Sequence, residues 1–195
     1  MIKYIIATCI LGSLFFACKN KNNTKQPTIT ADTTQPFPVA ELMQAEFEDV
    51  LHTPYFMYII TKKENEKKQD SITIQNKEFS KLIEPLIKIN LNTKQFKTKF
   101  KETAFDDLST QSITIITSSL DKNISFKNVT TLLNNETNKL KSMYFLFNET
   151  SGDSSVKTTY YLKANKSLTI NKVVQFKNQT PTGITKFINW NDKDR

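Results

Sequence analysis

Histidine and glycine are scarce in this chain, and both shortages restrict the chemistry open to it. His52 is the only histidine in 195 residues, so a site with several imidazole ligands is excluded. The three glycines, Gly12, Gly152 and Gly183, lie far apart. Phosphate-binding loops and dinucleotide turns need clustered glycine, because the backbone must approach the ligand closely. The sequence therefore predicts neither kind of nucleotide site.

Arginine is nearly absent as well. Among 27 basic residues only Arg195 is an arginine, and the formal net charge is +8. A positive charge favours anionic partners and surfaces. Arginine, however, is the side chain that grips phosphates and guanine edges with two hydrogen bonds, and the lysines are scattered among Thr, Asn and Glu. We therefore predict no nucleic-acid partner.

The N-terminus carries a short apolar run over residues 4–16, after a single positive charge at Lys3. The run is shorter than the ~20 residues that span a bilayer as a helix. Its length and its flanks are typical of the apolar core of a secretory signal peptide. We therefore assign residues 1–17 to a signal peptide.

The run ends Leu14-Phe15-Phe16-Ala17-Cys18, and polar sequence follows. This ending resembles the lipobox of bacterial lipoproteins, in which a small residue precedes a cysteine that is diacylated and becomes the mature N-terminus. The lipobox usually has leucine three residues before the cysteine, where this chain has Phe15. Phenylalanine-rich variants of this kind are similar to lipoproteins of the Bacteroidetes group. The resemblance implies that Cys18 is the lipidated residue.

The same resemblance implies a membrane-anchored lipoprotein of the cell envelope, on the periplasmic or surface face of the outer membrane. Two alternatives stay open. One is ordinary secretion with cleavage after Ala17, although Phe15 would then stand where a small residue is preferred. The other is an uncleaved anchor that ends in a chance cysteine. Cys9 would leave with the signal peptide and Cys18 would be blocked, so no disulfide, thiolate metal ligand or other metal site is expected in the mature domain.

Residues 18–37 are polar and predict a flexible tether after the lipidated cysteine. Two segments, Asp32-Thr33-Thr34 and Asp70-Ser71-Ile72, resemble the O-glycosylation motif of the Bacteroidetes group. The resemblance implies Thr33 and Ser71 as candidate glycosylation sites. Residues 38–195, which contain most of the 14 Phe and 6 Tyr, predict one globular domain.

The domain begins with helical periodicity and continues as strands. Residues 38–51 predict a helix, and a second one follows, capped by Asn76, with Phe79, Leu82 and Ile83 on its buried face and a stop or kink before Pro85. Residues 85–95 carry no pattern that we can assign. The predicted strands are residues 55–62, 71–75, 96–103, 111–118, 124–133, 140–147, 156–162, 168–176 and 183–190.

Short turns between successive strands favour antiparallel pairing. The predicted fold class is α+β, with N-terminal helices packed on a curved antiparallel β-meander of about seven to nine strands. This order resembles the half-barrel family of periplasmic lipoprotein carriers, which implies a curved sheet that encloses apolar chains. Phe126, Phe145, Phe147, Tyr160, Phe176 and Trp190 fall on predicted strands, where they form either plain core or the lining of such a cavity.

Candidate catalytic groups are few and weakly supported. Ser119 with Lys122, and Ser154 with Lys157, match the serine–lysine spacing of penicillin-recognising acylases, but that family's Ser-Asp-Asn and Lys-Thr-Gly elements do not occur. The acidic candidates for acid–base or cation chemistry are Asp106, Asp107, Glu46, Glu48 and Asp49, and His52 is a candidate base. Solvated faces, turn capping and a helix end account for all of them.

The sequence therefore predicts a lipid-anchored envelope protein that acts as a non-enzymatic binding or structural module, without catalytic residues, metal or cofactor. Its partners would be the membrane, through the N-terminal lipid, and a protein or an apolar ligand. The alternative is a periplasmic carrier of an apolar ligand on a half-barrel fold. A hydrolase is the third hypothesis.

The anchor is directly testable. Changing Cys18→Ser removes the only thiol that the predicted lipobox can acylate, so metabolic labelling with a radioactive or alkyne fatty acid should disappear from the protein. Cys9→Ser is the matched control and should leave the labelling unchanged. Labelling that persists in Cys18→Ser would refute the lipobox.

Overall fold

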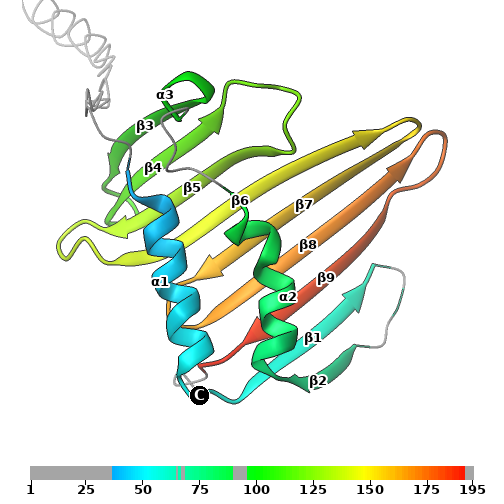
Figure 1. Ribbon diagram of the computed structural model, residues 1–195, viewed down its shortest axis with the longest axis horizontal. Helices are drawn as coiled ribbons and strands as arrows, with labels where there is room; N and C mark the ends of the chain where they lie inside the picture. The colour runs from blue at the N-terminus through cyan, green and yellow to red at the C-terminus, as the bar shows by residue number, and fades with distance from the viewer. Residues whose placement is uncertain (1–36, 65, 67–68, 90–95, 192–195) are drawn as a thin grey trace, which may run out of the picture.

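The computed structural model describes residues 37–64, 66, 69–89 and 96–191, which form one antiparallel sheet of nine strands with helices on one face (Figure 1). The helices are α1 (Val39–His52), α2 (Asn76–Ile87) and the short α3 (Phe96–Lys99). The strands are β1 (Met57–Lys63), β2 (Asp70–Ile74), β3 (Phe100–Asp107), β4 (Ser112–Ser119), β5 (Phe126–Asn134), β6 (Leu140–Ser151), β7 (Ser154–Lys163), β8 (Ser167–Phe176) and β9 (Thr182–Asn189). The predicted α+β class with a curved antiparallel meander is confirmed.

The strand order is β2-β1-β9-β8-β7-β6-β5-β4-β3. Strands β3 to β9 thus lie in the sheet in the order of the chain, and β3 forms one edge. The first hairpin, β1–β2, is added beside β9, so that β2 forms the other edge. There β1 pairs antiparallel with β9, with Ile59 opposite Ile188 and Lys63 opposite Ile184. The last strand is therefore an interior strand, held on one side by the first.

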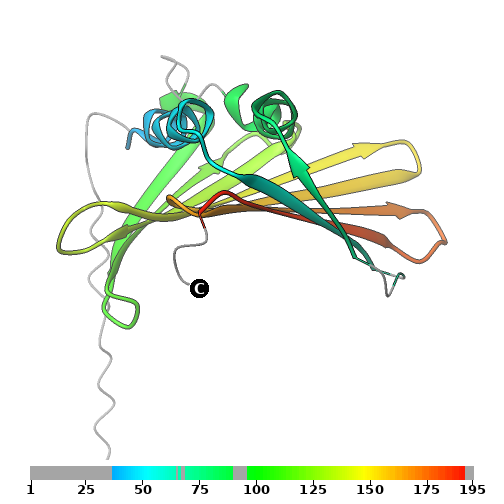
Figure 2. The ribbon, with the colours of Figure 1, turned by 90° about the horizontal axis from the view of Figure 1, so that it is seen from below.

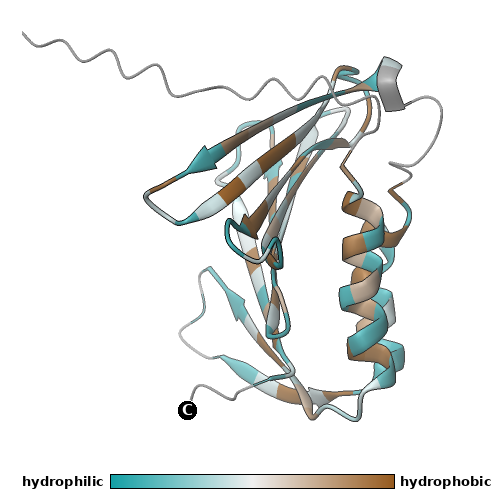
Figure 3. Ribbon diagram, turned by 90° about the vertical axis from the view of Figure 1, so that its left-hand side faces the viewer, coloured by the Kyte–Doolittle hydropathy of each residue, from teal (hydrophilic) through white to brown (hydrophobic). Residues whose placement is uncertain are grey.

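Both long helices lie on the same side of the curved sheet (Figure 2). We call this side the inner face and the opposite side the outer face. Successive residues of each strand alternate between the two faces, and Figure 3 shows the resulting change between apolar and polar segments along the strands. Among the described residues no helix lies over the outer face, and none is long and apolar enough to cross a bilayer.

The core lies between the two helices and the inner face. Val39, Met43, Phe47 and Val50 of α1 are buried, as are Phe79, Ile83 and Leu86 of α2. The Phe79 ring packs edge-on against two others: its centroid lies 6.0 Å from that of Phe47 and 5.7 Å from that of Trp190, one residue past β9. This cluster joins both helices to the sheet.

Three details of the sequence prediction are wrong. Residues 96–99 form α3, and the strand predicted over 96–103 begins only at Phe100. Of the stop or kink predicted at Pro85, the stop is wrong: α2 continues to Ile87, because the fully buried Leu86 holds its last turn against the core. Although Pro85 removes the N–H that would bind the carbonyl of Lys81, burial of a leucine offsets this loss by about 1.5–3 kcal/mol.

The third correction concerns the start of α2. The residue before the helix is Gln75, whose backbone N–H donates to the Glu78 carboxylate at 2.9 Å. Asn76 is the first helical residue, and its side-chain Nδ2 donates to the carbonyl of Leu51 at 2.6 Å. Asn76 therefore ties the start of α2 to the end of α1 instead of capping its own helix.

The ring cluster should dominate stability. Phe79 is fully buried, so Phe79→Ala should lower the free energy of unfolding by about 3–5 kcal/mol. Phe56, with 73% of its surface exposed, is the matched control, and Phe56→Ala should change it by no more than about 0.5 kcal/mol. Urea unfolding followed by circular dichroism gives both values. Similar losses in the two variants would contradict the assigned core.

Candidate functional site

The serines of the two serine–lysine patterns are engaged in turns. The Ser119 hydroxyl donates to the carbonyl of Asp121 at 2.9 Å and accepts the N–H of the same residue at 3.1 Å. The Ser154 hydroxyl donates to the carbonyl of Ser151 at 3.0 Å. These bonds close the ends of β4 and of the β6–β7 hairpin, which gives both serines a structural role.

The acidic pair at the end of β3 also includes a turn residue. Asp107 accepts hydrogen bonds from the hydroxyls of Ser109 at 2.6 Å and Thr110 at 2.8 Å, and the Ser109 hydroxyl is the main cause that lowers the pKa of this exposed carboxyl. Asp106 is exposed, and consecutive strand residues face opposite sides. The two carboxyls therefore do not share a cleft.

Two acidic side chains of α1, Glu46 and Asp49, make hydrogen bonds outside the helix. The half-buried Glu46 accepts the backbone N–H of Asn165 at 2.8 Å, which joins α1 to the β7–β8 turn. Asp49 accepts hydrogen bonds from Thr53 at 3.1 Å and from Tyr55 at 3.0 Å. Burial raises the pKa of Glu46 most, the Asn165 N–H opposes this rise, and the negative charge of Asp49 adds to it.

His52 lies at the exposed end of α1. Its Nδ1 is 2.8 Å from the carbonyl of Glu48 and 3.2 Å from the carboxylate of the same residue. Both contacts are made within one helical turn. The imidazole is thus held by a carbonyl and a carboxylate of its own helix.

The aromatic side chains predicted as core or cavity lining differ in burial and in position. Phe126, Phe145 and Trp190 are buried in the core, and Phe176, with 48% of its surface exposed, lies at the end of β8. Phe147 and Tyr160 are also largely buried, but both reach the edge of an open groove.

The groove begins where the helices stop covering the sheet. The hairpins β6–β7 and β8–β9 extend well beyond α2 (Figure 2), and the hollow beside them has a volume of about 500 Å³. Leu82 and Pro85 of α2 form one wall, and Phe147, Tyr160 and Ile170 form an apolar floor. Burial raises the pKa of the Tyr160 hydroxyl, with a smaller contribution from the charge of Glu149, which also lines the groove.

The cross-strand register gives the inner face a gradient from apolar to polar. Residues opposite one another share a face, so the pairing defines rows across the strands. Four successive rows toward the hairpin ends are Met143–Leu162–Leu168–Ile188–Ile59, Phe145–Tyr160–Ile170–Lys186–Thr61, Phe147–Thr158–Lys172–Ile184–Lys63 and Glu149–Val156–Val174–Thr182. The first row is fully apolar and buried, and lysines enter the second and third.

Three lysines line this groove against a single carboxylate, Glu149. Lys172 and Lys186 belong to the inner face of β8 and β9, and Lys81 lies on α2. Within the described part of the chain, none of the three ammonium groups makes an ion pair or a side-chain hydrogen bond. The groove thus combines an apolar floor with unneutralised positive charge.

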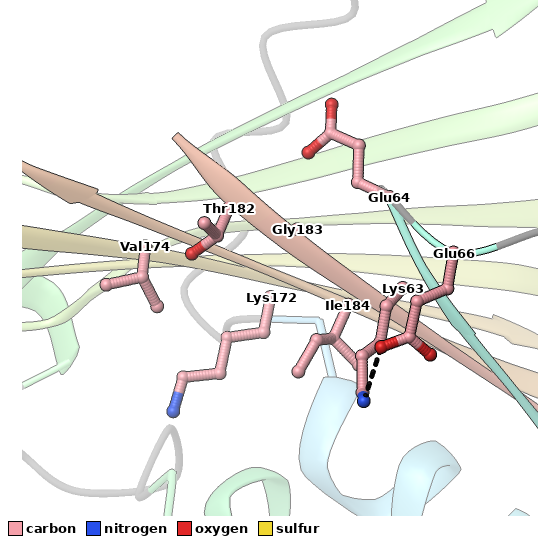
Figure 4. A pocket seen from close by; sticks show the side chains of 8 residues that line it. All are labelled: Lys63, Glu64, Glu66, Lys172, Val174, Thr182, Gly183 and Ile184. Carbon is pink, nitrogen blue, oxygen red and sulfur yellow. Dashed lines mark hydrogen bonds and ion pairs between the residues drawn. The ribbon is translucent and has the colours of Figure 1, made fainter. Parts of the chain in front are cut away.

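A second hollow of about 360 Å³ adjoins the groove near the end of β1 and shares Lys172 and Ile184 with it (Figure 4). Here Lys63 is paired with Glu66 at 2.8 Å. The carbonyl of Gly183 accepts the N–H of Glu64 at 3.0 Å, and a Cβ on this glycine would meet the Glu64 carboxylate at 2.8 Å. Of the two lysines that line this hollow, Lys63 is therefore paired with a carboxylate, whereas Lys172, which the hollow shares with the groove, is not paired with one among the described residues.

The remaining candidates lie elsewhere. Ser71 is exposed on β2, while Cys18 and Thr33 lie outside the described residues. Within the described ranges no three His, Cys, Asp or Glu side chains gather where they could hold a metal ion. Comparison of the chain with family models, with curated proteins and with solved structures gave no match.

The groove lysines were not among the predicted site residues, although the sequence of β9 carries a signal for them. The alternation Ile184, Lys186, Ile188, Trp190 places a lysine on the face that should be buried. Lysine is almost never fully buried without a partner. A lysine on an inward position therefore indicates that the cover of the sheet ends nearby.

The raised pKa of Glu46 predicts a specific pH dependence. Glu46 binds its proton more tightly in the folded than in the unfolded chain, so its contribution to stability is complete below the ordinary pKa of 4.5 and is lost as the pH rises through the raised value. Glu46→Gln should abolish this loss. Urea unfolding at about pH 4 and about pH 7 gives the free energy of unfolding of both proteins. Relative to the wild type, the value for the variant should be higher at about pH 7 than at about pH 4.

The control for this experiment is Glu136→Gln, in the exposed β5–β6 turn. Its stability relative to the wild type should not show this gain with pH. If Glu46→Gln and Glu136→Gln respond alike, the burial of Glu46 does not control the effect.

Proposed function

We propose that this chain is a lipid-anchored protein of the cell envelope that acts as a non-enzymatic binding module, with the groove beside α2 as its ligand site. The observation that carries the proposal is the open groove of about 500 Å³, whose floor is formed by Phe147, Tyr160 and Ile170. Ligand sites are typically concave and largely apolar, with a volume of roughly 300–1,000 Å³ and a few polar groups that orient the ligand. The groove meets each of these criteria.

The N-terminal segment supports the envelope location. The lipobox-like ending at Cys18 would fix the chain to a membrane, and a flexible tether over residues 18–37 would have a root-mean-square reach of about 25 Å. This reach suffices to hold the groove away from the bilayer surface. The membrane is therefore the first partner that we propose, through the lipid on Cys18.

The roles of the polar candidates support a binding module rather than an enzyme. Ser119, Ser154 and Asp107 bond within turns, and Glu46 fastens α1 to the sheet. General acid–base catalysis needs titratable groups that converge on one substrate. The described candidates are instead distributed over α1, the end of β3, the end of β4 and the start of β7.

The alternative is a periplasmic carrier of an apolar ligand on a half-barrel fold, and one observation favours it. The curved sheet carries both helices on its inner face, as a lid would lie (Figure 2). Between the helices and the sheet, however, Phe79 of α2 and Met143 and Phe145 of β6 are fully buried. A cargo would therefore be held at the open end of the face rather than enclosed under α1 and α2.

Filling the groove tests the proposal. Thr158 lies on the floor between Phe147 and Lys172, so Thr158→Trp should weaken binding of the neutral probe N-phenyl-1-naphthylamine about tenfold, which corresponds to about 1.4 kcal/mol. Fluorescence titration of the full chain carrying Cys18→Ser measures this without competition from the anchor's own acyl chains.

Lys157→Trp is the matched control, because residue 157 adjoins Thr158 on the same strand but faces the outer side. Its affinity for the probe should remain within about twofold of the parent. Equal affinities of all three proteins, or no binding by the parent, would contradict the groove as the ligand site.

A further inference from the structure

Lys172 and Lys186 lie on the inner face of the sheet, in rows that also contain apolar side chains. Lys186 stands between Ile170 and Thr61 in its row, and Lys172 stands between Thr158 and Ile184. Both strands lie inside the sheet, with neighbours on each side. Two inward lysines on interior strands thus point into the hollow that α2 borders.

The lysines and the carboxylate of the groove lie at different distances from the hairpin ends. Glu149, the only acidic side chain among the described residues of the lining, lies in the last of the four rows toward the hairpin ends. Lys172 and Lys186 lie in the two preceding rows, and Lys81 faces them from α2. Positive charge therefore gathers between the helix and the sheet, directly beside the apolar floor of Phe147 and Tyr160.

We propose that the groove binds a single-chain anionic amphiphile, a long-chain fatty acid, with its carboxylate between Lys81, Lys172 and Lys186 and its chain along Phe147, Tyr160 and Ile170. This inference rests on the proposed binding function and adds the chemical class of the ligand. A carboxylate complements unpaired ammonium groups through short, charge-assisted hydrogen bonds. A volume of about 500 Å³ lies within the range of small-molecule sites.

A different role for the lysines makes a different prediction. Lysine stems can simply cover apolar surface while the charge stays in water. Replacement by methionine separates the two roles, because it keeps the apolar stem and removes the charge. If the lysines only cover the floor, Lys172→Met and Lys186→Met leave the affinity for a carboxylate unchanged.

The test compares dodecanoate with 1-dodecanol, which has the same chain and no charge, by displacement of N-phenyl-1-naphthylamine from the full chain carrying Cys18→Ser. Dodecanoate should bind more tightly, and added salt should weaken dodecanoate but not the alcohol. Lys172→Met and Lys186→Met should each weaken dodecanoate about three- to tenfold and leave 1-dodecanol unchanged or tighter.

Two sets of variants control the result. Lys157→Met, on the outer side of β7, should alter neither ligand, and Lys172→Arg should retain dodecanoate binding because it keeps the charge. Unfolding midpoints measured on every variant identify any loss that comes from misfolding.

The outcomes distinguish the two levels of the proposal. Equal binding of acid and alcohol, unaffected by the methionine variants, would overturn the anionic ligand and leave the apolar groove in place. Binding of neither ligand, together with failure of the neutral probe, would overturn both.

Discussion

The packing of Phe79 between Phe47 and Trp190 is the contact on which the arrangement of the molecule depends. It brings together side chains from α1, α2 and the end of β9, with ring centroids 6.0 and 5.7 Å apart. Buried aromatic rings combine a large apolar area with a preferred edge-on geometry. The cluster therefore holds both helices against the end of β9.

Much of the fold could be predicted because each strand carries its own alternation and each turn its own chemistry. The predicted turns at Gly152, Asn165 and Asn178 all have positive φ in the structure, the conformation that glycine and asparagine adopt most readily. The predicted hairpin of β1 and β2 is also present, with Ile59 opposite Ile72. Such local signals locate an element to within a few residues of its ends.

The pairing of β1 with β9 could not be predicted in the same way. Alternation determines which face a residue takes, but not which strand lies beside it. Ile59 and Ile188 are paired only because the first hairpin returns to the edge of the completed meander, and this contact spans most of the chain. The error at α3 has a related cause, because the apolar spacing of Phe96 and Phe100 suits one turn of helix as well as a strand.

The candidate site lies where the buried core of the inner face ends. Apolar residues and lysines on the same face of β8 and β9 determine this boundary. Isoleucine at 170, 184 and 188 would extend a dry core along β8 and β9, whereas Lys172 and Lys186 on the same face require water or an anion. With leucines at both positions this part of the inner face would carry a larger exposed apolar patch, and such a patch would promote association. The lysines therefore keep the open end of the sheet soluble while α2 covers the rest. Lys172 and Lys186 also lie beside the apolar floor of the groove. The two lysines that end the apolar core therefore also supply the positive charge of the groove.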